Sequence, residues 1–228
     1  MKKRSKRYKE IFKTAIRDKK ISAKEIIDLV KKNSTCKFDE SIDVSLRINL
    51  KQSKGGDLNL RTIVNLPNGS GKKSKVAVLC ESDKLEEAKK SGAEVIGSDD
   101  LLEKIASGKI DFTKLVCTPA MMGKIGKHGK VLGPQGLMPN PKLGTVTNDI
   151  TKAVKDIKTG LVEIRNDKDG NLASTIGRKS FSSEKLLDNY NHFIESVKKE
   201  KPETIKGEFV KNVYITSTMG ISYKVGAK

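Results

Sequence analysis

Residues 75–119 read KVAVLCESDKLEEAKKSGAEVIGSDDLLEKIASGKIDFTKLVCTP, and their pattern decides the fold class. Short apolar runs alternate there with segments that have helical spacing. The apolar runs lie at 75–80, 94–97 and 114–119, and the helical segments at 83–91 and 99–107. Apolar strands separated by helices are typical of a parallel sheet that is covered on both faces. The middle of the chain is therefore predicted to be a three-layer α/β/α unit.

The two ends of the chain have a different pattern. Apolar and polar side chains alternate strictly from Ile42 to Leu50, which indicates a strand with one solvated face. SAKE at 22–25 is a capping box that starts a helix before this strand. Beyond residue 159 the alternation returns, and a helix with one apolar face follows over 183–200.

Because the ends resemble each other more than the middle, we expect a two-domain α/β protein with one domain inserted into the other. Residues 1–68 and 159–228 are predicted to form a discontinuous outer domain, and residues 69–158 an inserted, Rossmann-like domain. The segment PNGSGKKS at 67–74 has the composition of a linker.

Charge points to the class of partner. The 228 residues include 46 Lys and Arg against 28 Asp and Glu, a net charge of +18. The two end segments together carry +13 of this charge and the middle carries +5. Such a surplus favours a polyanionic partner, with nucleic acid ahead of an anionic membrane surface. We expect the outer domain to bind this polyanionic partner.

Several other classes are disfavoured by the sequence. No apolar run is long enough to span a bilayer. The basic start, MKKRSKRYKEIFKTAIRDKK, lacks the apolar core of a secretory signal. Its helical stripe is expected to pack against the protein, although a membrane surface is an alternative. The residues of this stripe are Tyr8, Ile11, Phe12, Ala15 and Ile16. Three widely spaced cysteines favour a reducing cytoplasmic compartment without a metal site.

No catalytic or nucleotide-binding motif is complete. GSGKKS at 69–74 has Lys73 where a phosphate-binding loop needs Ser or Thr, and it precedes a strand instead of following one. Neither His128 nor His192 belongs to a recognisable catalytic group. We therefore predict a protein that is not an enzyme, with no cofactor and no metal. A nucleotide-dependent enzyme using the parallel-sheet domain is the alternative.

Three segments are candidates for surface recognition. GPQGLMPNPK at 133–142 mixes proline and glycine and is a shaped loop. TSTMG at 216–220 offers hydroxyls and a glycine that permits close approach, or it is simply a strand end with a turn. KFDES at 37–41 can equally be a connection whose Phe38 packs into the core. Aromatic residues make up only 4% of the chain, which disfavours a sheet that stacks RNA bases.

VLGPQGLMPNPKLGTVT at 131–147 resembles the signature of bacterial large-subunit ribosomal protein one, the L-one stalk protein family. KFDESIDV, VEIRNDKDG and YITSTMG also resemble that family, in the same order, so the resemblance covers essentially the whole chain. It implies a structural protein that binds large-subunit ribosomal RNA at the mobile stalk and assists release of deacylated exit-site tRNA. It also implies a ribosome-bound, cytoplasmic protein that represses its own messenger RNA and is a monomer off the ribosome. The hinge between the domains would lie near 67–74 and 156–160.

Carried over by position, the resemblance implies an RNA-binding surface made from three segments of the outer domain. Its residues are Lys37, Phe38, Ser41, Asp167, Lys168, Thr218, Met219 and Gly220. Lysines suit phosphates, while hydroxyls and backbone groups suit ribose 2′-hydroxyls. Ser41 stands where threonine is usual in the family, and Gln135 stands where arginine is common. The loop at 133–142 is therefore expected to be a rigid surface of the inserted domain, with the principal RNA contacts elsewhere.

Overall fold

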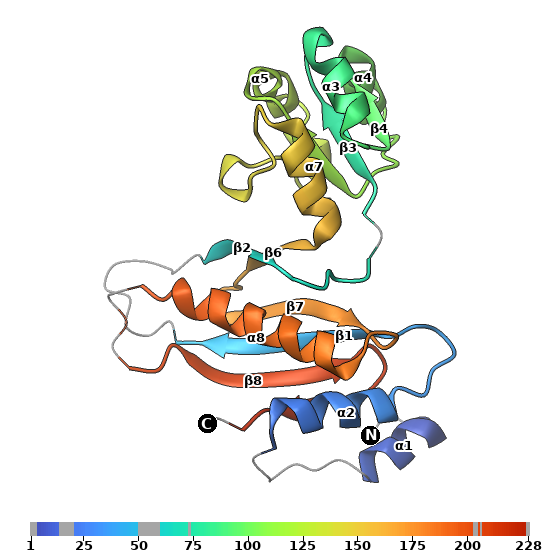
Figure 1. The fold of residues 1–228 in the computed structure, drawn as a ribbon, viewed down its shortest axis with the longest axis vertical. Helices are drawn as coiled ribbons and strands as arrows, with labels where there is room; N and C mark the ends of the chain where they lie inside the picture. The colour runs from blue at the N-terminus through green and yellow to red at the C-terminus, as the bar shows by residue number, and fades with distance from the viewer. Residues whose placement is uncertain are drawn as a thin grey trace. The chain divides into compact units, whose positions relative to one another are not determined.

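A computed structural model describes residues 4–13, 21–49, 60–72, 74–202, 205 and 207–226 (Figure 1). The chain divides into two compact units. One is formed by Met1–Gly71 together with Val162–Lys228, and the other by Lys72–Leu161. Both units mix helices and strands, one around an antiparallel sheet and the other around a parallel sheet. The predicted two-domain α/β fold class is confirmed.

The outer unit is built around a four-stranded sheet of order β7-β1-β8-β9. Its strands are β1 (Ser41–Ile48), β7 (Asn171–Arg178), β8 (Val210–Ser217) and β9 (Tyr223–Lys224), and neighbouring strands are antiparallel. The central strand β1 pairs with β7 from Ser41 to Arg47 and with β8 from Ile42 to Ile48. The sheet therefore joins the two ends of the chain.

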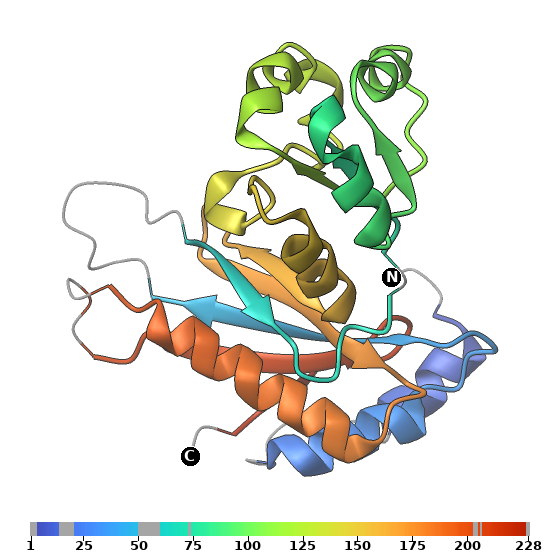
Figure 2. The same cartoon turned by 45° about the horizontal axis from the view of Figure 1, so that its top comes forward.

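Helices cover one face of this sheet. They are α2 (Ala23–Asn33) and α8 (Ser183–Lys199), which pack against each other as well (Figure 2). The predicted helix start is confirmed at α2, where the Ser22 hydroxyl accepts a hydrogen bond from the Glu25 N–H at 3.4 Å. A shorter helix, α1 (Lys6–Lys13), precedes it in the sequence.

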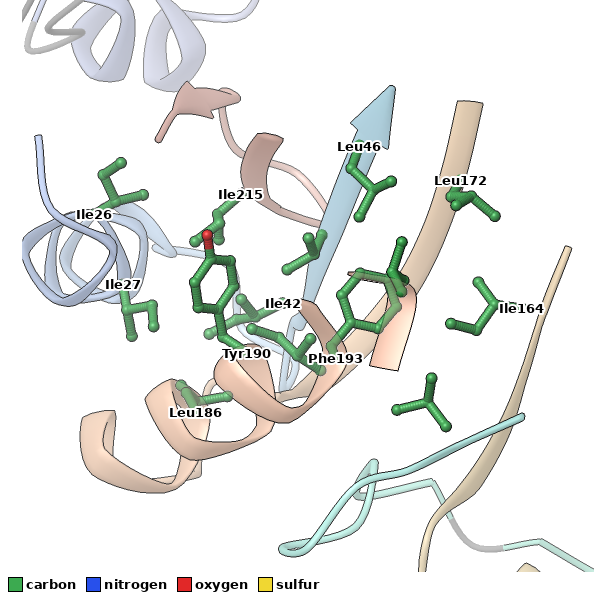
Figure 3. Packing of buried hydrophobic residues seen from close by; sticks show 14 of the residues in the cluster. Ile26, Ile27, Ile42, Leu46, Ile164, Leu172, Leu186, Tyr190, Phe193 and Ile215 are labelled. Carbon is green, nitrogen blue, oxygen red and sulfur yellow. The ribbon is translucent and has the colours of Figure 1, made fainter. Parts of the chain in front are cut away.

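The alternation in β1 decides which face is buried. Ile42, Val44, Leu46 and Ile48 are all at most 2% exposed, and they meet the apolar faces of α2 and α8. Figure 3 shows Leu186, Tyr190 and Phe193 of α8 directed at this layer. The predicted strand ends at Ile48, and Leu50 lies outside the described residues.

A second, two-stranded sheet belongs to the same unit. It consists of β2 (Arg61–Asn65) and β6 (Leu161–Arg165). An ion pair between Arg61 and Glu163, with N and O atoms 2.6 Å apart, joins the strands. Val64 and Ile164 are each 1% exposed and extend the core of the outer unit.

The middle unit contains the parallel sheet that the sequence predicts. Its strands are β3 (Val76–Leu79), β4 (Val95–Gly97) and β5 (Lys114–Cys117), in the order β4-β3-β5. The helices are α3 (Leu85–Lys90), α4 (Asp99–Ala106), α5 (Met122–Gly126), α6 (Gly129–Leu132) and α7 (Ile150–Thr159). Short 3-10 turns, η1 (Ser82–Lys84), η2 (Pro119–Met121) and η3 (Pro141–Leu143), connect them.

Alternate residues of β3 enter two separate cores. Ala77 and Leu79 pack with α4, α5 and α6 on one face, while Val76 and Val78 pack with α3 and α7 on the other. This is the three-layer arrangement expected from strands without a wet face. The Gly/Pro loop at 133–142 leads into η3, where the Asn140 side chain accepts a hydrogen bond from the Lys142 N–H at 2.9 Å.

Candidate nucleic-acid interface

The start of β1 and the end of β8 bring two of the three predicted RNA-binding segments together. In the sheet register Ile42 lies opposite Ser217, so Ser41 and Thr218 are neighbours. The Thr218 N–H donates to the Ser41 carbonyl at 3.1 Å, and the Ser41 N–H donates to the Thr218 hydroxyl at 3.0 Å. Segments 177 residues apart in sequence thus form one continuous edge, which we call the grip: residues 37–41 and 218–220.

A buried carboxylate holds the two halves of the grip. Glu40 is 0% exposed, and its oxygens accept hydrogen bonds from the N–H groups of Cys36 at 3.2 Å and Met219 at 3.1 Å. Burial by itself would raise the pKa of Glu40, but the hydrogen bonds from Met219, Cys36 and Ser217 outweigh it and hold the pKa below its usual value. The sequence analysis did not identify Glu40. Its only signal is an acid between the predicted contacts Phe38 and Ser41.

The grip exposes apolar side chains that the rest of the fold buries. Phe38 is 51% exposed and Met219 is 49% exposed, and these are the large exposed hydrophobic side chains among the described residues. The interpretation that Phe38 packs into the core is wrong. Lys37 and Thr218 are exposed beside them. The grip therefore presents a cation, a hydroxyl, an aromatic ring and a thioether to solvent.

Gly220 closes the turn that presents Met219. Its N–H donates to the Ser217 carbonyl at 3.1 Å. A Cβ atom at position 220 would lie 2.4 Å from the Ser217 hydroxyl oxygen, which is closer than real Cβ contacts. Because that hydroxyl also hydrogen-bonds Glu40, the turn and the buried carboxylate share one partner. A larger residue at position 220 would require the Ser217 hydroxyl to move.

The third predicted segment is a turn between β6 and β7. Asp167 accepts hydrogen bonds from the N–H groups of Asp169 at 3.0 Å and Asn171 at 2.7 Å, and from the Asn171 side-chain amide at 2.9 Å. These bonds, the Asn171 side chain above all, lower the pKa of Asp167. The carboxylate shapes the turn, and Lys168 projects beside it as an exposed cation. Direct contact of Asp167 with RNA stays a prediction.

The structure does not bring this turn to the grip. Arg47 pairs with Asn171 at one end of the β1–β7 ladder, and Ser41 pairs with Arg178 at the other. At a rise of about 3.3–3.4 Å per residue, the two groups of predicted residues lie roughly 20 Å apart. The polar face of β1, with Asp43, Ser45 and Arg47, runs between them. The predicted site residues therefore form two separate groups on one unit.

Metal sites and membrane-spanning helices were also sought in the described part of the chain. There, no group of three or more His, Cys, Asp or Glu side chains is placed to hold a metal ion. The helices described between residues 4 and 226 include none with the length and apolarity to cross a membrane. Ile11 of α1 is only 6% exposed, so the expected packing of this helix is observed for that residue. Ala15 and Ile16, which continue the predicted stripe, lie outside the described residues.

Comparison with known proteins agrees with the four motifs quoted above. Residues 30–221 match the Ribosomal protein L1p/L10e family. Large ribosomal subunit protein uL1 of Pelagibacter ubique is 54% identical over 225 residues, covering 97% of this chain and 96% of the relative. The protein of the same name from Thermosipho melanesiensis is 47% identical, covering 99% and 97%, and that from Bifidobacterium adolescentis is 48% identical, covering 95% and 94%. The chain belongs to the Ribosomal protein L1p/L10e family.

Proposed function

We propose that this chain, a structural component of the large ribosomal subunit by its family, binds large-subunit ribosomal RNA through the grip. Phe38 and Met219 carry the proposal, because they are exposed together on the unit that holds most of the net charge. Exposed apolar side chains ringed by cations and hydroxyls suit folded RNA, where sugars and unstacked bases are accessible. The family is not an enzyme family, so the nucleotide-dependent enzyme is set aside.

Within the proposal the two groups of predicted residues have different tasks. The grip recognises shape through Phe38, Met219 and the backbone of the Thr218–Gly220 turn. Lys168 supplies a phosphate contact roughly 20 Å away. A span of this length fits a structured RNA lying along the polar face of β1. Ser41 and Thr218 use their backbone and hydroxyl groups first to hold each other.

The more specific role that we propose, on the ribosome and on messenger RNA, follows from the family resemblance. The protein acts on the ribosome in the cytoplasm, at the mobile stalk near the tRNA exit site, and assists departure of deacylated tRNA. The same grip binds a similar site in its own messenger RNA and represses translation. Off the ribosome the chain is a monomer.

A hinge belongs to the same proposal, near 67–74 and 156–160. The buried Asn189 side chain accepts a hydrogen bond from the Asn68 N–H at 3.0 Å and donates one to the Gly69 carbonyl at 2.9 Å. These bonds fasten the first linker to α8 through Gly69.

The test compares binding to a transcript of the ribosomal stalk RNA with binding to a base-shuffled transcript, across a salt series. Each neutralised phosphate contributes about −0.7 to −0.9 to the log–log slope. We expect a preference for the stalk transcript that persists at physiological salt. The double variant Thr218→Val, Met219→Ala should lose about 1–3 kcal/mol per contact removed.

Lys142→Ala in the Gly/Pro loop is the matched control, since it removes a charge from an exposed residue of the middle unit. Its effect on the preference for the stalk transcript should be small. Equal and steeply salt-sensitive binding of both transcripts by the unmodified protein would refute a shaped RNA site. It would leave only the non-specific attraction of the net charge.

A further inference from the structure

A pocket of about 380 Å³ opens beside the grip, against the start of α1. The residues that line it from the two sides include Arg4, Arg7, Tyr8, Thr218, Met219 and Gly220. Among the described residues that line the pocket there is no acidic side chain, while guanidinium groups come from two positions. Its walls thus contain two guanidinium groups, an aromatic ring and a thioether.

Arg7 fixes α1 to the grip. One guanidinium nitrogen donates to the Met219 carbonyl at 2.7 Å, and the other terminal nitrogen donates to the Thr35 hydroxyl at 3.4 Å. Thr35 immediately precedes the Cys36 whose N–H binds Glu40. Arg7 therefore connects the helix to Met219 of the grip and to Thr35, which precedes the grip in the sequence, and it is a positioning residue for this pocket.

Tyr8 is the aromatic side chain of the helical wall, and it contacts both the Phe12 ring and the Arg4 guanidinium. The rings of Tyr8 and Phe12 are stacked with centroids 6.1 Å apart, and the Arg4 guanidinium lies 5.0 Å from the first centroid and 4.9 Å from the second. Aromatic rings and arginine planes are the surfaces on which unpaired RNA bases stack. Arginine also supplies the hydrogen-bond geometry that phosphate groups match. The wall has the chemistry of a nucleotide site.

We propose that this pocket takes one unpaired nucleotide of the bound RNA, with its base between Tyr8 and Met219 and its phosphate on Arg4. The inference rests on the proposed RNA-binding function and adds α1 to the surface that recognises the RNA. The volume is at the small end of the range of about 300–1,000 Å³ for ligand pockets, which suits a single nucleotide. The apolar Ile11 is buried, so α1 does not present that residue to a lipid surface.

The experiment measures the ratio of affinities for the stalk and base-shuffled transcripts in pocket variants of the full chain. Tyr8→Leu should lower the affinity for the stalk transcript about 5- to 150-fold, as expected for loss of one base stack, while Tyr8→Phe should keep it. Arg4→Ala should lower the same affinity without unfolding the protein, because Arg4 is exposed. Lys9→Ala is the matched control, an exposed cation on α1 that does not line the pocket.

The possible outcomes separate the two proposals. If the unmodified protein prefers the stalk transcript, and folded Tyr8→Leu and Arg4→Ala variants keep the full preference, the pocket proposal is overturned and the grip remains. If the unmodified protein shows no preference, both proposals fall. Binding to vesicles of anionic lipid that Arg4→Ala abolishes, with RNA affinity unchanged, would overturn the RNA assignment in favour of a membrane surface.

Discussion

Glu40 is the residue on which the geometry of the grip depends. Its carboxylate accepts hydrogen bonds from the N–H groups of Cys36 and Met219, and the residue is fully buried. A buried acceptor with two backbone donors fixes the separation of the segments that carry those donors. In the proposed RNA interface, this side chain would act only through the position it gives to Phe38 and Met219.

Replacing Glu40 by Gln should therefore weaken both folding and RNA binding. The amide keeps the shape but loses charge and one acceptor oxygen, which leaves a buried N–H unsatisfied at about 1–3 kcal/mol of unfolding free energy. Thermal unfolding and affinity for the stalk transcript measure the two effects. Glu25→Gln makes the same charge change at an exposed position and should alter neither by a comparable amount.

The effect of Glu40 should also depend on pH. Its pKa in the folded protein lies below the usual value of 4.5, so the ionised side chain stabilises the fold above pH 4.5. That contribution is lost as the pH falls through the lower folded-state pKa. The stability difference between the unmodified protein and Glu40→Gln should narrow in acid. A difference that stays constant from neutral pH to strong acid would exclude an ionised Glu40.

Gly220→Ala should disturb the turn through steric crowding. The added methyl meets the Ser217 hydroxyl, which must move away from Glu40, so affinity for the stalk transcript should fall while the fold persists. Gly123→Ala is the matched control, because a Cβ there has open space and its helix accepts alanine. Equal affinities of the Gly220→Ala and Gly123→Ala variants for the stalk transcript would show that the turn accommodates the movement of the Ser217 hydroxyl.

At the scale of single residues, sequence reasoning found the exposed members of the grip but not the residue that organises them. Phe38 and Met219 are named by motifs that resemble a family. Glu40 becomes important only when β1 pairs with β8, and no local pattern encodes a pairing across 177 residues. Local composition also left open whether Phe38 is buried, because an aromatic residue before a strand is common in cores.

At the scale of elements, α8 does more than cover the sheet. Its buried Asn189 donates to the Ile176 carbonyl of β7 at 2.7 Å and also binds the linker at Asn68 and Gly69. One side chain thus holds a strand, a helix and the approach to the middle unit. Its hydrogen bonds satisfy backbone groups that would otherwise lie unpaired next to the core.

Asn189→Ala should release the linker. Loss of these bonds leaves buried backbone groups without partners and should lower the unfolding free energy by about 1–3 kcal/mol. Limited proteolysis should also cut faster between residues 67 and 74. Asn191→Ala changes an exposed asparagine of the same helix and is the control. Unaltered cleavage in a destabilised Asn189→Ala protein would mean that the linker is held by other contacts.

Periodicity predicted the elements well where one face or both faces are buried. Strict alternation located β1, and apolar runs located β3 and β5, because burial decides the side-chain pattern of these strands. An apolar run also located the edge strand β4, whose residues are only partly buried. Periodicity could not show that the turn of Lys168 stands at the opposite end of β1 from Ser41. That separation follows from the antiparallel register of β7, which depends on the whole sheet.

At the scale of the molecule, the two units have unequal charge. The end segments that make up most of the outer unit carry +13, and the middle carries +5. The grip, the Lys168 turn and the α1 pocket all belong to the outer unit. Specific recognition of the stalk RNA should therefore reside there.

Residues 72–161, produced alone, should fold and yet bind the stalk transcript weakly. The unit has its own sheet and cores on both faces of it, so it has the internal contacts of a domain. Circular dichroism and cooperative unfolding check the fold, and the salt series checks the affinity. Tight, selective binding by this fragment would show that the recognition surface lies in the middle unit and not in the outer unit.

Because the middle unit is inserted between β1 and its partner strands, the sheet of the outer unit can form only late in synthesis. The strand β1 leaves the translating ribosome with both of its edges unpaired, since β7 and β8 are encoded after the middle unit. At about 5–20 residues per second, the 177 residues between Ser41 and Thr218 take roughly 10–35 seconds to synthesise. The inserted unit can complete its fold during that interval. A nascent chain interrupted before Thr218 therefore lacks the 218–220 half of the grip, so the proposed RNA interface can assemble only after that segment is made.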